Sequence, residues 1–291
     1  MGVDDVVSVL MTVAFVLSGG GNLGAIQVGM LRSLFAAGIR PDFIVGTSVG
    51  AVNGGWLAGR GLDADIDQLA VVWQRLRRSD VFPTRPLGGL RGFLGQTDHL
   101  VSNDGLRRLL QRELTFTNLE DTVIPLHVVA TDITSGHDHL LSTGDATDAI
   151  CASSAIPGVF PSIAWDGLRL VDGGVVNNCP ISHAVSLGAT TIWVLPCGYA
   201  CSLAQPPKSA RARALQAVSL LIQQRLRNDA DRYTTVLDLR IVPTLCPVRV
   251  MPTDFSKAVQ LIDDAARLTA TWLDDPDRTV GQRLGLHDHG A

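Results

Sequence analysis

A serine flanked by glycines is the residue of this sequence whose setting most favours covalent chemistry. Gly46, Ser48 and Gly50 form a G-x-S-x-G pattern that follows an apolar run and precedes a segment of small residues. A serine on a sharp turn between a strand and a helix exposes its hydroxyl, and the helix N-terminus favours negative charge beside it. We therefore predict that Ser48 is a nucleophile in acyl transfer. The alternative is a turn serine that faces solvent.

Three consecutive glycines, Gly19, Gly20 and Gly21, follow an earlier apolar run. Glycine lets the backbone pass close to a ligand and turn its N–H groups toward it. Such donors stabilise the oxyanion of a tetrahedral intermediate, and the loss of one costs roughly 10²–10³ in rate. An oxyanion hole is one interpretation of this run, and a tight turn that requires positive φ is the other.

Asp172 is the candidate partner of the serine, because it ends a predicted strand and precedes Gly173 and Gly174. Open α/β sheets build their sites at strand ends, so its carboxylate can point to the same edge of the sheet as Ser48. An aspartate before glycine is also a common turn residue. To act as a base, Asp172 needs hydrogen-bond contact with Ser48 and partial burial, because an unperturbed carboxyl has a pKa of about 3.9.

Histidine is the usual base for a catalytic serine, and no histidine of this chain is well placed for that role. A triad in the order Ser, Asp, His needs a histidine after Asp172. His183 lies in a predicted helix, and His287 and His289 lie in the C-terminal tail. We therefore favour Asp172 acting directly as the base, and a triad esterase that uses His183 is the alternative.

The elements that would position these residues alternate between strands and helices. Predicted strands are short apolar runs at 13–17, 43–45, 126–130, 139–142, 168–171, 191–195 and 236–242. Predicted helices cover 25–37, 49–58, 63–78, 104–114, 145–153, 179–188, 210–229 and 254–273. This alternation indicates an α/β fold with a mainly parallel or mixed central sheet and helices on both faces.

The chain of 291 residues is long enough for one large α/β domain. We expect residues 1–11 to be an N-terminal extension, 12–200 to form the core, 201–275 to complete the same domain, and 276–291 to be a tail. Residues 79–103 mix prolines and glycines with large apolar side chains. That mixture suits a cap over an apolar site or a packed surface loop.

Four motifs, taken in order, resemble the patatin-like phospholipase family. They are the glycine loop that ends at Gly24, the G-x-S-x-G pattern, the run Ser-Ser-Ala-Ile-Pro-Gly-Val-Phe-Pro at 153–161, and the later Asp-Gly-Gly. The resemblance covers about residues 15–188 and implies a lipid acyl hydrolase on a three-layer α/β/α fold.

The resemblance also implies roles for individual residues. It makes Ser48 the nucleophile, Asp172 the proton acceptor and the glycine run the oxyanion hole, with no cofactor and with phospholipids or other fatty acyl esters as substrates. Thr131 and Asp132 resemble a strand end of the family whose role is structural. Where the family commonly has arginine or lysine, this chain has Leu23. A catalytically weak relative that binds lipid or a partner is therefore a further alternative.

Two other interpretations of the motifs have less support. The glycine loop fits a dinucleotide fingerprint, but that site needs an acidic residue at the end of the second strand. Here Asp42 lies at the start of that strand. His137, Asp138 and His139 could be metal ligands, but no further ligands accompany them in the sequence, and we predict no metal site.

Composition and charge narrow the remaining classes of protein. The net charge of −4 gives no overall attraction to nucleic acid. No apolar run reaches the roughly 18 residues that a membrane span needs. We expect a cytoplasmic protein, with any membrane contact peripheral and made by apolar residues such as Phe82, Phe93 and Leu94. The sequence does not set the oligomeric state.

Cysteine usage points to a reducing compartment. The five cysteines include no C-x-x-C pattern, which favours buried, free thiols over a pair formed by Cys197 and Cys201.

Overall fold

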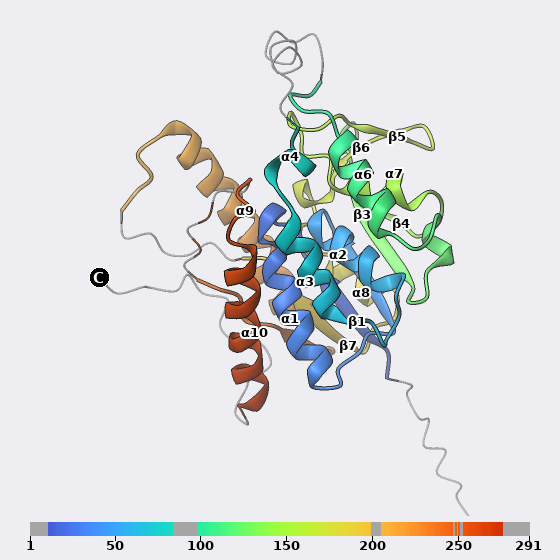
Figure 1. The fold of residues 1–291 in the computed structure, drawn as a ribbon, viewed down its shortest axis with the longest axis vertical. Coiled ribbons are helices and arrows are strands. Elements are labelled where there is room, and N and C mark those ends of the chain that lie inside the picture. The colour runs from blue at the N-terminus through green and yellow to red at the C-terminus, as the bar shows by residue number, and fades with distance from the viewer. Residues whose placement is uncertain are drawn as a thin grey trace, which may run out of the picture.

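The centre of the molecule is a mixed β-sheet (Figure 1). The computed structural model describes residues 11–83, 98–198, 205–246, 248, 250 and 253–275, and within them the sheet has eight strands. The strands are β1 (Val13–Leu17), β2 (Phe43–Thr47), β3 (Leu126–Asp132), β4 (Asp138–Leu141), β5 (Ile163–Trp165), β6 (Leu168–Asp172), β7 (Thr191–Leu195) and β8 (Asp238–Ile241).

The middle of the sheet is parallel and one side of it is antiparallel. Strands follow the order β5-β6-β3-β2-β1-β7-β8, and β4 pairs with β3 off this path. The pairs from β3 through β2, β1 and β7 to β8 are parallel. The pairs of β6 with β3 and β5, and of β4 with β3, are antiparallel. The predicted mainly parallel or mixed sheet is confirmed.

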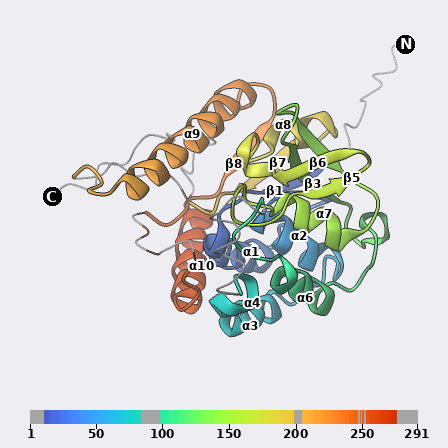
Figure 2. The same cartoon turned by 90° about the horizontal axis from the view of Figure 1, so that it is seen from above.

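Helices cover both faces of the sheet, so the predicted three-layer α/β/α arrangement is also confirmed. One face carries α1 (Gly24–Ala36), α2 (Val49–Ala58), α3 (Ile66–Arg75), α6 (Asp104–Glu113), α7 (Ala146–Ser153) and α10 (Ala258–Asp274). The opposite face carries α8 (Ile181–Ser186) and α9 (Ala210–Tyr233). Figure 2 shows α8 and α9 across the sheet from α1, α3 and α10.

The strands divide their side chains between two cores, as a period of two requires. In β1, Phe15 and Leu17 pack into the core beneath α1 and α2, whereas Ala14 and Val16 pack into the core beneath α8 and α9. All four side chains are fully buried. Continuous apolar runs therefore form these strands because both faces of the sheet are covered.

Several helices begin at residues other than those predicted, because the capping residue determines where a helix starts. The helix predicted from residue 63 begins at Ile66, because the side chain of Asp65 accepts a hydrogen bond from the Asp67 N–H. The helix predicted from 179 is shorter, and Pro180 is its N-cap. The strand β5 was not predicted; it has three residues, and only Ile163 among them is buried.

The segment predicted as a cap is described only in part. It contributes the short helix α4 (Arg78–Val81), which packs beside α6. Residues 84–97, with Phe93 and Leu94, lie outside the described residues. The expectation of a cap therefore stays a prediction for that part of the chain.

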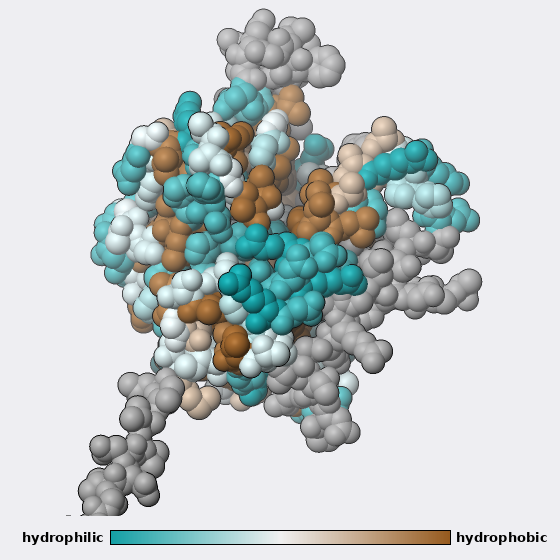
Figure 3. Space-filling view, turned by 180° about the vertical axis from the view of Figure 1, so that it is seen from behind, coloured by the Kyte–Doolittle hydropathy of each residue, from teal (hydrophilic) through white to brown (hydrophobic). Residues whose placement is uncertain are grey.

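The C-terminal part joins the same sheet, since β8 pairs with β7 and α10 packs against α1. The domain boundaries that we expected from the sequence stay predictions, and residues 1–10 and 276–291 are not among those described. The N-terminal half of α9 extends away from the sheet, and Val218, Leu220 and Leu221 on it are exposed. Figure 3 shows apolar side chains gathered on this part of the helix.

Three cysteines match the expectation of buried free thiols, namely Cys151, Cys179 and Cys197. Because Cys197 is free, the pair considered for it does not form. Cys246 is disulfide-bonded, so the expectation is wrong for this residue. Of the helices in the described ranges, none combines the length and the apolar character that crossing a bilayer requires.

Candidate active site

Ser48 occupies a strained turn between β2 and α2. Its φ of 54° and ψ of −123° place a non-glycine residue in a region that side chains rarely adopt. The turn is tight because a Cβ on Gly50 would overlap the Leu17 carbonyl oxygen and a Cβ on Gly46 would lie 2.7 Å from the Ala51 backbone. Both glycines of the pattern therefore serve close packing of helix on strand.

The side chain of Ser48 points at Asp172. Ser48 Oγ donates a hydrogen bond of 2.7 Å to Asp172 Oδ2, and the Gly174 N–H donates one of 2.7 Å to Oδ1. Both side chains are buried. Burial is the main cause that raises the pKa of Asp172 to about 6, against the lowering effect of the two hydrogen bonds. A carboxylate with this pKa is ionised at neutral pH and is a better proton acceptor than an ordinary aspartate.

Asp172 reaches this position on a strand that runs opposite to β2. The strand β6 is antiparallel to β3, and Asp172 pairs with Ala130. Gly173 allows the chain to turn there, because a Cβ on it would overlap the Val129 carbonyl oxygen. A Cβ on Gly174 would come within 2.9 Å of Asp172 Oδ1, so this glycine keeps the carboxylate accessible to its N–H donor.

The glycine loop lies against Ser48, but its three N–H groups differ in whether they already have a hydrogen-bond acceptor. The Gly19 N–H donates to the Asn178 carbonyl oxygen at 3.0 Å, so it is not free to bind an oxyanion. Among the hydrogen bonds of the described residues, the N–H groups of Gly20 and Gly21 have no acceptor. Val49 begins α2, so its N–H has no intrahelical acceptor either. Sequence reasoning did not single out Val49.

Gly19 instead has a steric role. A Cβ at this position would lie 3.2 Å from Ser48 Cβ and would overlap Asn178 Oδ1. Gly24, which ends the loop, is equally confined, because a Cβ there would overlap Val49 Cγ2 and lie 2.8 Å from the Trp73 ring. The loop can approach Ser48 only because these positions lack side chains.

A buried polar network holds the loop and the helices around it, and sequence reasoning missed it. Gln27 Nε2 donates to the carbonyl oxygens of Ser18 and Leu195, each at 2.9 Å. Gln27 Oε1 accepts from Asn53 Nδ2 at 2.9 Å, and Trp73 Nε1 donates to Asn53 Oδ1 at 2.9 Å. The signal in the sequence is two amide side chains within otherwise apolar helical segments.

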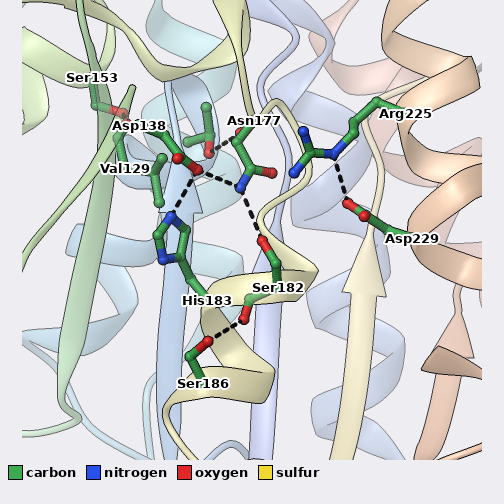
Figure 4. Close-up of polar contacts among 10 residues, drawn as sticks. Val129, Asp138, Ser153, Asn177, Ser182, His183, Ser186, Arg225 and Asp229 are labelled. Atoms are coloured by element: carbon green, nitrogen blue, oxygen red, sulfur yellow. Dashed lines mark hydrogen bonds and ion pairs between the residues drawn. The ribbon is translucent and has the colours of Figure 1, made fainter. Parts of the chain in front are cut away.

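Ser153 holds the strained turn at Ser48 through two hydrogen bonds. Its hydroxyl accepts the Ser48 N–H at 2.8 Å and donates to the Val129 carbonyl oxygen at 2.5 Å. Ser153 is fully buried at the end of α7, and Figure 4 shows it beside Val129. The run at 153–161 was recognised as a motif, but the sequence did not reveal this role.

His183 is engaged elsewhere. Its Nε2 lies 2.9 Å from Asp138 Oδ2, and Asn177 Nδ2 donates to the same oxygen at 2.7 Å (Figure 4). The cluster is joined to the strand that carries Ser48, because Thr47 Oγ1 donates to the Asn177 carbonyl oxygen at 3.0 Å. The structure places no hydrogen bond between His183 and either Ser48 or Asp172.

Other residues that the sequence singled out have local roles. Asp132 accepts from the N–H groups of Thr134 and Ser135. A hydrogen bond from the Ser135 side chain, followed by the one from the Thr134 N–H, lowers the pKa of Asp132 to about 2. Within the described ranges, no group of three or more His, Cys, Asp or Glu residues could hold a metal ion. Asp138, considered as a metal ligand, binds Asn177 and His183 instead.

An apolar pocket opens at Ser48, with an empty volume of about 510 Å³. Apart from Gly21, Ser48 and Ser154, its lining consists of apolar and aromatic side chains from α2, α3, α4, α6 and the segments near them. Phe82 stacks on Phe160 with ring centroids 5.2 Å apart and also contacts Phe255. Such a lining suits a hydrocarbon chain.

Phe82 was expected on the surface as a membrane contact. It is only 9 % exposed and lines this pocket, so that expectation is wrong for Phe82. The first part of the predicted cap thus contributes to the wall of the site.

Comparisons with known proteins agree with the family that the motifs resemble. Residues 15–185 match the family model described as patatin-like phospholipase. The chain is 30% identical over 189 residues to mouse patatin-like phospholipase domain-containing protein 6, and 31% identical over 190 residues to the lysophospholipase nte1 of Aspergillus terreus. Each alignment covers 64% of this chain, but only 14% of the mouse protein and 12% of the Aspergillus protein.

A solved structure is also similar. The chain superposes on VipD from Legionella pneumophila with a TM-score of 0.47 and 15% identity, covering 90% of this chain and 67% of that one.

Proposed function

Because the chain belongs to the patatin-like phospholipase family, we propose that it is a serine lipid acyl hydrolase that uses a Ser48–Asp172 dyad. Its reaction would be of the phospholipase A or esterase type, on the esters of fatty acids. The observation that carries the proposal is the 2.7 Å hydrogen bond from Ser48 Oγ to Asp172 Oδ2, beside an apolar pocket that Ser48 lines.

The reaction proceeds in two steps. Ser48 Oγ attacks the carbonyl carbon of the ester while its proton passes to Asp172 Oδ2, which gives a tetrahedral intermediate. The intermediate collapses to an acyl-serine, and the leaving alcohol takes the proton from Asp172. Water then attacks the acyl-serine as Asp172 accepts its proton. The bond to Ser48 Oγ breaks, Oγ takes the proton from Asp172, and the fatty acid leaves.

Backbone amides stabilise the negative charge of the intermediate in this proposal. Among the described residues near Ser48, the N–H groups of Gly20, Gly21 and Val49 have no acceptor and are the proposed donors. Amides fixed in this way act strongly because they need no reorganisation during the reaction. Gly19 is not part of this set, since its N–H is bound to Asn178.

A fatty acyl chain is the substrate group that fits the pocket. The similarity to proteins named patatin-like phospholipase and lysophospholipase supports a lipid ester. The lining beyond Ser48 is apolar, so it would hold the acyl chain and leave the head group at the mouth. Leu23 at the loop supplies no cation for an anionic head group.

Turnover of a p-nitrophenyl fatty acyl ester and of a lysophospholipid tests this function. We expect hydrolysis by the wild type and a fall in kcat of about 10³-fold or more in Ser48→Ala and Asp172→Asn. His183→Ala is the control, and its kcat should stay within about threefold. A large loss in His183→Ala would favour the triad esterase, and no turnover by folded wild type would favour the catalytically weak relative.

A further inference from the structure

A second apolar cavity lies behind the pocket at Ser48, between α2, α3 and α6. Its empty volume, which includes space open to solvent, is about 360 Å³, and a water-sized sphere can occupy about 30 Å³ of it. Four residues line both cavities, namely Val52, Trp73, Leu76 and Leu109. The two cavities are therefore adjacent and share these four side chains as part of their walls.

On α2 and α6, the residues that line only the far cavity follow in sequence those that line only the near cavity. On α2, Val49 lines only the near cavity and Trp56 only the far one; on α6, Leu106 lines only the near cavity and Leu110 only the far one. Since α2 starts directly after Ser48 and rises 1.5 Å per residue, Trp56 lies about 12 Å from the serine along the helix axis. The far cavity therefore follows the near one in the direction of α2, away from the serine.

The far cavity offers hydrocarbon contacts along most of its length. Asn53 lines it, but its amide is bound to Gln27, the Gly24 carbonyl oxygen and the Trp73 ring N–H. Glu113 lies at the last turn of α6 and pairs with Arg112 at 2.8 Å. An apolar tail fits between the serine and that polar end, whereas a charged head group would lose its hydration there.

We propose that the far cavity is a second compartment for the acyl chain, and that the side chains of Val52, Trp73, Leu76 and Leu109 set the preferred chain length. This proposal rests on the proposed function and specifies its substrate as a long, unbranched fatty acyl ester. Short chains occupy only the near pocket. Long chains pass these four side chains and gain additional burial in the far cavity.

Hydrolysis of p-nitrophenyl butyrate and p-nitrophenyl dodecanoate tests the proposal in a matched pair of variants. Val72 lines the far cavity only, and its neighbour on α3, Val71, lines neither cavity and is 39% exposed. In Val72→Phe, the ratio of kcat/KM for dodecanoate to that for butyrate should fall about tenfold. In Val71→Phe, the same ratio should stay within about twofold of wild type.

A variant of the four shared lining residues tests whether the same ratio can be raised, and it removes side-chain volume without overpacking the core. Leu109→Ala removes part of the wall, so the ratio should rise in favour of dodecanoate. Thermal unfolding of each variant shows whether the compared proteins are folded. Unchanged ratios in folded Val72→Phe and Leu109→Ala would overturn the second compartment alone. Failure of the wild type to hydrolyse either ester would instead overturn the proposed function, and the compartment with it.

Discussion

The hydroxyl of Ser48 lies 2.7 Å from a carboxylate oxygen of Asp172, although 124 residues separate them in the chain. They arrive on strands that run in opposite directions: β2 is parallel to β3, and β6 is antiparallel to it. Both strands end beside the middle of β3, where Thr47 pairs with Val129 and Asp172 with Ala130. The sheet therefore fixes the separation of the two side chains.

The pH dependence of the reaction follows from the buried carboxyl. Asp172 must be ionised to accept the serine proton, and burial raises its pKa to about 6. We expect kcat/KM to rise about tenfold per pH unit below pH 6 and to level off above it. A profile measured between pH 4.5 and pH 9 checks this, and a plateau that extends down to pH 4.5 would exclude Asp172 as the titrating base.

The same carboxyl should reduce stability at neutral pH. Its native pKa of about 6 lies above the unfolded value of about 3.9, so the native state binds the proton more tightly. Below pH 4 the carboxyl is protonated in both states and does not reduce the free energy of unfolding. As pH rises from about 4 to about 6 the free energy of unfolding falls, and above pH 6 it is lower by about 2–3 kcal/mol.

Asp172→Asn removes that titration. Relative to wild type, the variant should gain about 2–3 kcal/mol in the free energy of unfolding between pH 4 and pH 7.5. Urea unfolding at both pH values measures the gain. An equal difference between variant and wild type at the two pH values would contradict a raised native pKa.

Ser153 is expected to position the nucleophile. Ser153→Ala leaves the buried N–H of Ser48 without an acceptor, which costs about 1–3 kcal/mol. We expect kcat to fall about tenfold in folded protein, because the turn that orients the Ser48 hydroxyl loosens. Ser186→Ala, which alters an exposed serine of α8, is the control and should leave kcat unchanged.

The glycine loop can be tested with two neighbouring substitutions. A Cβ on Gly20 would overlap Cys197 Cβ, whereas a Cβ on Gly198 would meet only Leu23 Cδ1, at an ordinary 3.6 Å. Gly20→Ala should displace the amides of the loop and lower kcat about 10²-fold. Gly198→Ala should retain activity within about threefold. Equal activity in the two variants would contradict a role for this loop in binding the oxyanion.

The sequence was sufficient to predict most of the fold because its strands are buried on both faces. The run Val13–Leu17 and the pattern around Ser48 identify a strand, a turn and a helix without reference to distant contacts. The direction of β6 was not predictable in this way. Its pairing with β3 depends on residues far apart in the chain, such as Thr131 and Val171, which are 40 positions apart.

Contacts between distant segments also explain what the sequence did not reveal about the site. The Gly19 N–H is not free to bind an oxyanion because it donates to the carbonyl oxygen of Asn178, which lies in the turn after β6. The burial of Phe82 depends on Phe160 and Phe255. The composition of the segment around Phe82 suggested an apolar residue on the surface. Its place in the wall of a pocket results from tertiary packing, which the local sequence does not show.

Labelling with a fluorophosphonate probe, followed by peptide mapping, tests the central claim most directly. The probe reacts with an activated serine hydroxyl, so wild type should carry it on the peptide that contains Ser48. Ser48→Ala should carry none, and Asp172→Asn should label at least about 10²-fold more slowly. Labelling at another residue, or labelling of Asp172→Asn at the wild-type rate, would contradict a Ser48 nucleophile activated by Asp172.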